Sequence, residues 1–264
     1  MIVAIYEAGT TRLIAYAPRI ATSTEAVPTN VKTVAFDPAA DIKIDLAGPR
    51  SVYLHTTGTT NLIADLGGLV HRAHMLFQEL NGDVTVCNGA INMIDEPDHD
   101  ALGFNFVTPG DIVLQDLSLF NVTGSQEGTH GDCAQAYSNT GTWFFNRVVM
   151  TSHYQGLFIK NEGNRLCEGA HLDDVELHDL AGAGKALWLG DNGFAAAWAT
   201  DGKPRAILDN VRVKPFEDRS LRDCVHPKPG LTWQGVPIGV LTDDDWQSAY
   251  WPEASGIVGR VVRI

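Results

Sequence analysis

A repeat of about 30 residues runs through the middle of the chain. Four segments carry an Asp or Asn followed by a short apolar run, and these markers are Asp116, Asn146, Asp174 and Asn210, which lie 30, 28 and 36 residues apart. A second apolar run follows three of the markers, at residues 132–136, 156–159 and 185–189. Two short strands per period, joined by polar turns of variable length, predict parallel coils that stack at the strand spacing of about 4.8 Å.

The rest of the chain is also strand-like, because short apolar or alternating runs are separated by Gly, Asn, Asp and Thr. We therefore expect an all-β protein, a parallel β-helix of roughly six or seven coils over residues 41–224. Residues 1–40 are predicted to form an N-terminal cap or entry segment, and residues 225–264 a C-terminal cap or association segment, since an open coil would expose unpaired backbone. Within the tail, Asp243–Tyr250 is a candidate helix.

Charge and composition exclude several classes of protein. The 32 acidic residues outnumber the 19 basic ones, which gives a net charge of −13 and argues against nucleic-acid binding. No run of about 18 apolar residues is present, so we expect no membrane insertion. The four cysteines form no CxxC pair, and no basic segment precedes the first apolar run, so we expect synthesis and assembly in the cytosol.

Basic residues are unevenly placed along the chain. Between Arg72 and Arg147 there is no Lys or Arg, while ten acidic residues fall in that stretch. Four of them crowd into one turn-like loop and are candidate ligands for Ca²⁺, the one cofactor that the sequence suggests: Asp95, Glu96, Asp98 and Asp100. The alternative is a solvated acidic turn.

A possible catalytic group surrounds His130 and Asp132. Residues i and i+2 of a strand share a face, so this imidazole and carboxylate could act as base and orienting group. Lys160 and Arg165 follow the next strand-like run and could neutralise the carboxyl group of a uronate during proton abstraction. The alternative is a polar ladder that satisfies turn backbone, and the sequence leaves open whether the protein is an enzyme.

Side chains that could hold a sugar recur on successive repeats. The candidate carbohydrate-binding residues are Gln135, Tyr137, Tyr154, Phe158 and Trp188. Trp143 belongs to the same aromatic series. Facing outward, these rings would form a stacking platform, and facing inward they would form core. A shift of one residue in register exchanges the two outcomes.

Two segments carry a resemblance to a known superfamily. His130-Gly131-Asp132-Cys133-Ala134-Gln135, followed by Gln155-Gly156-Leu157-Phe158-Ile159, resembles the repeats of the pectate-lyase-like superfamily. The resemblance covers about residues 105–215 and implies a right-handed parallel β-helix. That superfamily contains polysaccharide lyases, mannuronan epimerases, glycoside hydrolases and phage tailspikes.

Two functions follow as hypotheses. The first is a phage or phage-like virion spike or fibre that binds host-surface polysaccharide as a receptor, is assembled in the cytosol and contacts other virion proteins. Resemblance to phage spikes implies a homotrimer. The alternative is a polysaccharide lyase or depolymerase that acts on an acidic glycan in a groove of the β-helix, either on a virion or after secretion by a non-classical route.

Overall fold

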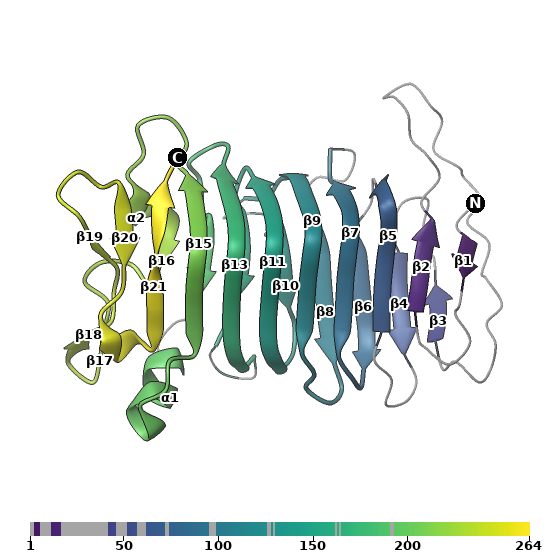
Figure 1. Cartoon of the computed structure of the whole chain (residues 1–264), viewed down its shortest axis with the longest axis horizontal. Helices are drawn as coiled ribbons and strands as arrows, with labels where there is room; N and C mark the ends of the chain where they lie inside the picture. Colours follow the sequence, from purple (N-terminus) through teal and green to yellow (C-terminus); the bar gives the residue numbers. More distant parts are fainter. Residues whose placement is uncertain are drawn as a thin grey trace.

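The structure, a computed structural model shown in Figure 1, describes residues 74–264 except 95–98, 126, 127, 129, 162, 164, 191 and 192. Before residue 74 it describes the strands β1 to β5, with the side chains of Leu62, Ala64, Leu66 and Val70. The predicted cap at residues 1–40 lies outside the described residues, apart from the strands β1 (Val3–Ile5) and β2 (Arg12–Tyr16).

Two mainly parallel sheets make up the described fold, and successive strands of the chain alternate between them. The long-strand sheet contains the parallel strands β5 (Leu62–His71), β7 (Val84–Asn92), β9 (Ile112–Val122), β11 (Thr140–Ser152), β13 (Cys167–Asp179), β15 (Ala206–Lys214) and β21 (Ile257–Arg263). The short-strand sheet contains β4 (Val52–Thr56), β6 (Met75–Leu80), β8 (Leu102–Phe106), β10 (Asp132–Ala136), β12 (Gln155–Ile159), β14 (Leu187–Leu189) and β16 (Val225–His226). The prediction of an all-β protein is confirmed.

Antiparallel strands lie at both ends of the long-strand sheet and at the N-terminal end of the short-strand sheet, whereas the parallel strand β16 ends the short-strand sheet at its other end. At the N-terminal end β1 pairs with β2, and β3 (Ile42–Asp45) pairs with β4. At the C-terminal end β20 (Ser248–Tyr250) and β19 (Leu241–Thr242) continue from β21. The strands β17 (Thr232–Trp233) and β18 (Val236–Pro237) form a separate two-stranded antiparallel sheet. The tail after residue 224 therefore adds strands to both sheets: β16 to the short-strand sheet, and β21, β20 and β19 to the long-strand sheet.

Helical structure is short in the described residues. It consists of α1 (Gly193–Asp201), α2 (Leu221–Cys224) and the 3-10 turn η1 (Glu253–Ser255). None of these helices is long and apolar enough to span a membrane. The helix predicted for Asp243–Tyr250 is wrong, because that segment is a turn followed by β20. The carboxylate of Asp243 accepts hydrogen bonds from the backbone N–H groups of Gln247 and Ser248, at 2.7 and 2.9 Å.

A column of left-handed residues crosses the long-strand sheet. Each member occupies the same register position on its strand, and the members are Asn88, Asp116, Arg147, Asp174 and Asn210, with φ of 58°, 50°, 55°, 54° and 51°. Asn and Asp tolerate this conformation better than other non-glycine residues. On β9 the left-handed residue breaks the inward–outward alternation, so that Gln115 and Asp116 are both exposed between buried leucines.

This column corrects the repeat marker in β11. The predicted marker Asn146 pairs with Gln115 and Asp173, whereas the left-handed position falls one residue later, at Arg147. The true steps of the column are therefore 28, 31, 27 and 36 residues, from positions 88, 116, 147, 174 and 210.

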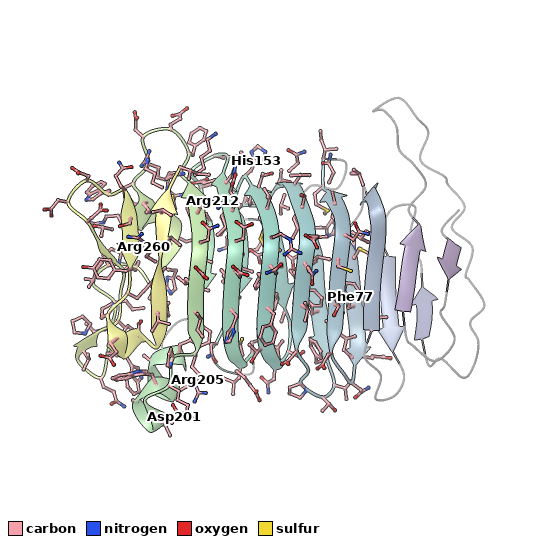
Figure 2. All side chains as sticks on the ribbon, viewed as in Figure 1. Phe77, His153, Asp201, Arg205, Arg212 and Arg260 are labelled. Atoms are coloured by element: carbon pink, nitrogen blue, oxygen red, sulfur yellow. The ribbon has the colours of Figure 1, made fainter. Side chains whose placement is uncertain are left out.

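Ion pairs cover the outer surface beside the column. The Arg147 guanidinium donates to both carboxylate oxygens of Asp116, at 2.6 and 2.8 Å. Arg212, labelled on β15 in Figure 2, donates to Asp174 at 3.0 Å and to Glu176 at 3.3 Å. Because the Arg147 pair is about half exposed, solvent screens its charges and we expect it to add little to stability.

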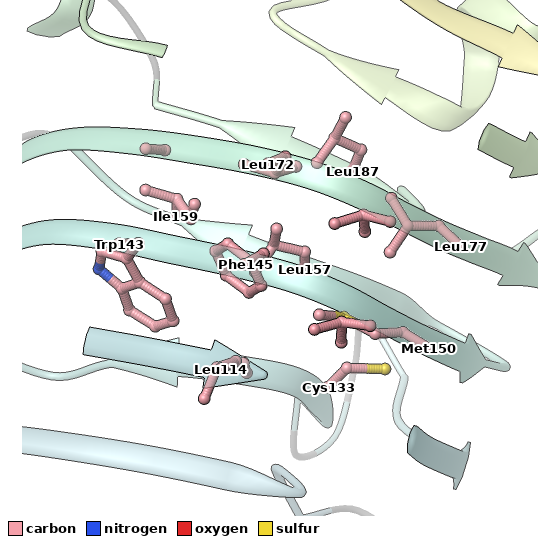
Figure 3. Packing of buried hydrophobic residues seen from close by; sticks show 14 of the residues in the cluster. Leu114, Cys133, Trp143, Phe145, Met150, Leu157, Ile159, Leu172, Leu177 and Leu187 are labelled. Carbon is pink, nitrogen blue, oxygen red and sulfur yellow. The ribbon is translucent and has the colours of Figure 1, made fainter. Parts of the chain in front are cut away.

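The core lies between the two sheets and is rich in aromatic rings. Phe77 stacks on Phe104 with ring centroids 5.2 Å apart, and Phe104 meets Trp143 edge to face at 5.5 Å. Trp143 is 1% exposed, and its indole N–H donates to the hydroxyl of Thr140 at 3.0 Å. Figure 3 shows Trp143 and Phe145 among leucines of both sheets, which include Leu114 and Leu157. Trp143 therefore belongs to the core and not to an outward platform.

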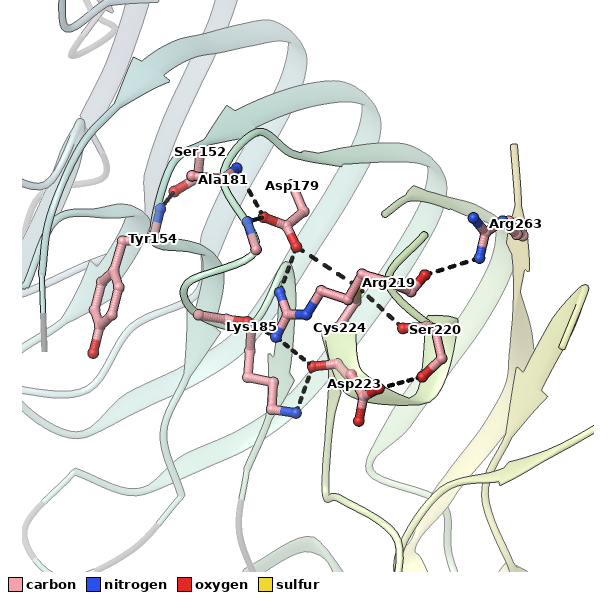
Figure 4. A network of polar contacts seen from close by, with 12 residues as sticks. Ser152, Tyr154, Asp179, Ala181, Lys185, Arg219, Ser220, Asp223, Cys224 and Arg263 are labelled. Carbon is pink, nitrogen blue, oxygen red and sulfur yellow. Dashed lines mark hydrogen bonds and ion pairs between the residues drawn. The ribbon is translucent and has the colours of Figure 1, made fainter. Parts of the chain in front are cut away.

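Arg219 ties the segment before α2 to the preceding strands (Figure 4). Its guanidinium forms an ion pair with the carboxylate of Asp179, whose side chain is 3% exposed. The same guanidinium donates to the carbonyl oxygens of Gly184 and Asp223. A buried carboxylate is thereby neutralised, which links β13, the turn before β14 and the C-terminal end of the sheets.

Candidate functional site

An outward row of side chains crosses the short-strand sheet. Gln135 on β10, Phe158 on β12, Trp188 on β14 and His226 on β16 are successive register partners. On each strand the row residue lies beside fully buried core residues such as Leu157, so the strand alternation directs its side chain away from the core. We call these four residues the outer row.

Three rings of the outer row are held against one another. Phe158 meets Trp188 edge to face with centroids 5.2 Å apart, and Trp188 stacks on His226 at 3.9 Å with an angle of 16° between the planes. Phe158 and Trp188 are partly exposed, whereas His226 is largely covered. The row therefore presents aromatic surface whose orientation is fixed by packing.

Tyr137 extends this surface onto the neighbouring strand. Its side chain is 38% exposed, and the ring lies so close to Gly103 that a Cβ at that position would be 2.9 Å from Cε2 of Tyr137. The phenol hydroxyl donates to the carboxylate of Asp100. The guanidinium carbon of Arg165 lies 5.9 Å from the ring centroid, within the range of a cation–π contact.

A second column lies at the beginning of the short strands. Asp132 pairs with Gln155, and counting back two residues from the Ala134–Leu102 pair aligns Asp132 with Asp100. The backbone N–H of Asp132 donates to Oδ1 of Asp100 at 2.8 Å. All three side chains are buried, and Asp132 is 0% exposed. We call Asp100, Asp132 and Gln155 the buried acceptor cluster.

Electrostatics in this cluster oppose ionisation of both carboxyl groups together. Burial raises the pKa of Asp132 well above its usual range, and the negative charge of Asp100 raises it further, while Arg165 acts in the opposite direction. Burial also raises the pKa of Asp100, although its hydrogen bond from Tyr137 opposes the shift. The pKa of Tyr137 is raised by burial and by Asp100.

The structure separates the residues predicted to be catalytic. His130 is exposed, and its ring packs 5.3 Å from the ring of Tyr154, with no hydrogen bond to Asp132. Asp132 begins β10, whereas Lys160 lies just beyond the other end of the neighbouring β12, so the strand length separates them. Arg165 is the predicted basic residue whose charge reaches Asp132 and Tyr137.

The predicted sugar-binding residues divide by exposure. Phe158 and Trp188 are partly exposed in the outer row, and Tyr137, which lies beside it, is exposed. Gln135 belongs to the same row but is only 9% exposed. Tyr154 is 7% exposed, which leaves little of its ring for a ligand.

The predicted calcium loop is only partly described. Asp95, Glu96 and Asp98 lie outside the described residues, and Asp100 is buried against Tyr137 and the backbone of Asp132. Among the side chains that the structure describes, no group of three or more His, Cys, Asp or Glu residues is arranged to hold a metal ion.

Two features of these sites are not predicted by the sequence: the place of His226 in the outer row and the place of Asp100 beside Asp132. His226 joins the outer row from a segment that was assigned to the C-terminal cap, although extending the repeat by one period would have reached it. Asp100 was grouped with its acidic loop, whereas the register places it beside Asp132. Comparison of the chain with protein families, with curated proteins and with solved structures yields no match.

Proposed function

We propose that the chain is a right-handed parallel β-helix whose outer row binds carbohydrate. The alternation of strands between two parallel sheets supports coiling, because each period then contributes one strand to each sheet. Parallel strands joined by a crossover are right-handed in about 98% of cases, which supports the handedness.

The single observation that carries the binding proposal is the alignment of Phe158, Trp188 and His226 across three neighbouring strands. Neighbouring strands are about 4.8 Å apart, so a linear glycan lying across the strands would meet a new side chain at each step. The C–H groups of a sugar ring pack on aromatic side chains, and the partly exposed rings of Phe158 and Trp188 offer that surface.

The biological setting of this proposal comes from the sequence resemblance. We propose a virion spike or fibre that recognises cell-surface polysaccharide, and a homotrimer is part of that proposal. The measurement that addresses the assembly is the molar mass of the purified chain by light scattering, and a monomer would contradict the trimer without affecting the binding proposal.

The test of carbohydrate binding is a glycan array followed by calorimetric titration of the best ligand. We expect Trp188→Ala to weaken binding by about tenfold or more, the equivalent of one lost stacking contact. Trp246→Ala is the matched control, because Trp246 is also exposed, at 42%, but lies in the turn before β20 under Arg222. Equal affinities of the Trp188 variant and the parent protein, with unchanged circular dichroism, would refute the proposal.

A second candidate is the polysaccharide lyase or depolymerase. The observation that favours it is the placement of Arg165 against Tyr137 near two carboxyl groups of raised pKa, Asp100 and Asp132. Carbohydrate binding is better supported because Asp132 is fully covered and a polymer does not reach it. A panel of uronate polymers assayed for the absorbance of unsaturated products tests the lyase, and loss of any activity in Arg165→Ala would support it.

A further inference from the structure

Three oxygen atoms of the buried acceptor cluster have no hydrogen-bond partner. They are both carboxylate oxygens of Asp132 and Oε1 of Gln155, and each is almost completely inaccessible to solvent. The two residues are direct register partners on β10 and β12. A buried polar atom without a partner is destabilising, and a charged one more so, so three such atoms on paired residues point to a group that compensates them.

The surrounding side chains do not supply that compensation. Asp100 is itself an acceptor, and it already receives the Tyr137 hydroxyl and the backbone N–H of Asp132. Arg165 acts on Asp132 through its charge, and His74 and His99, whose rings stack at 4.9 Å, act on Asp100 in the same way. None of these side chains forms a hydrogen bond to the carboxylate of Asp132 in the described part of the chain.

The nature of the three atoms selects the kind of ligand. All are oxygen acceptors, and together with Asp100 they bring two carboxyl groups and one amide carbonyl to a single place. A proton on Asp132 could satisfy only one further acceptor, whereas a hard cation can be coordinated by all three oxygens at once. A divalent ion would also neutralise both carboxylates.

We propose that Asp132, Gln155 and Asp100 hold a calcium ion between successive short strands. Backbone carbonyls or water complete the coordination, because Ca²⁺ takes six to eight oxygen ligands. The ion links β8, β10 and β12, so it acts as a structural link beneath Tyr137. This site differs from the acidic loop predicted from the sequence, with which it shares only Asp100, and it does not depend on the carbohydrate proposal.

The experiment uses the full chain after treatment with a chelator. Thermal unfolding is followed with increasing Ca²⁺, and binding is followed by luminescence of Tb³⁺, a calcium substitute that nearby Tyr rings sensitise. At 100 times the dissociation constant of Ca²⁺ we expect Tm to rise by about 5–10 °C. We also expect saturable Tb³⁺ luminescence that Ca²⁺ displaces.

Two variants keep the test informative. Asp132→Asn keeps the shape and removes the charge, and Gln155→Met keeps the size and removes the carbonyl oxygen; both are expected to lose the Ca²⁺-dependent rise in Tm and the luminescence. Asp116→Asn is the control, since that exposed carboxylate lies on the other sheet. Absence of both signals in the parent chain, or their persistence in Asp132→Asn, overturns the proposal in favour of a hydrated or protonated carboxyl group.

Discussion

Gly103 is the position at which a single methyl group is expected to disturb the site most directly. A Cβ there would lie 2.7 Å from Cδ1 of Leu76 and 2.9 Å from Cε2 of Tyr137, and both distances are too short for real contacts. Both obstructing atoms are ends of side chains, so Gly103→Ala displaces them without breaking the backbone. We expect the Tyr137 ring to shift and its hydroxyl to move away from Asp100.

The magnitude of this effect follows from two contributions. Overpacking by one methyl group costs about 1–3 kcal/mol. Loss of a hydrogen bond to a buried carboxylate costs about 1.5–3 kcal/mol, and Tyr137→Phe removes that bond alone. Because Gly103→Ala already weakens the same bond, the double variant should be less destabilised than the sum of the single variants, by about 1 kcal/mol.

Equilibrium urea unfolding, followed by far-ultraviolet circular dichroism and by fluorescence, measures the four free energies of this cycle. Gln135→Ala serves as a control, since Gln135 is the register partner of Gly103 on β10 but takes no part in the Tyr137–Asp100 hydrogen bond. Additive effects of the two substitutions, within about 0.3–0.5 kcal/mol, would refute the coupling between Gly103, Tyr137 and Asp100.

Two further predictions concern stability away from the site. Arg147→Val should be less stable than Arg147→Gly by at least about 1 kcal/mol in urea unfolding. Both variants lose the same ion pair, but only valine is strained at a φ of 55°. Equal stabilities of the two variants would contradict the left-handed conformation. Arg219→Met should lower the free energy of unfolding by about 3–5 kcal/mol, because it leaves the Asp179 carboxylate buried without its counter-ion, with only backbone N–H groups such as that of Gly182 donating to it. Adding Asp179→Asn should restore part of that loss in the same measurement, and a double variant as unstable as Arg219→Met would argue against the charge as the cause.

The period of the repeat could be predicted because the same residue types, Asn and Asp, recur once in each repeat. A left-handed position favours Asn or Asp, and four of the five members of the column are Asn or Asp. Arg147 is the exception, and because its neighbour is an asparagine, the sequence predicts the left-handed position one residue too early, at Asn146. Asn146 pairs with Gln115 and Asp173, and this register is known only from the folded sheet.

The helices were harder to predict because local and tertiary signals disagree. Asp243 and the residues after it read as a capped helix, yet the Asp243 carboxylate closes a turn that leads into β20. The alanine-rich segment of α1 follows Gly190, in the connection between β14 and β15. This helix is an insertion between two strands of the repeat. Because the sequence on both sides of it is strand-like, the pattern of apolar residues does not indicate a helix there.

The two sites depended on register to different degrees. Phe158 and Trp188 each sit between two apolar residues, so a pattern of apolar runs alone cannot tell which of them face outward. The pairing of Leu157 with Leu187 in the core decides the matter and places both rings outside. Asp100 and Asp132 are separated by a long connection, and the sequence offers no way to count register across it.

The left-handed column also has a consequence for how the protein can change in length. Because every member occupies one register position, a cut from one member to the next removes a complete repeat: deletion of residues 116–146 joins Gln115 directly to Arg147, which is the partner position of Asp116. The first half of β9 and the second half of β11 then form one continuous strand, in which every residue keeps its register position. The chain is therefore modular, and whole repeats are the units in which it can be shortened or extended.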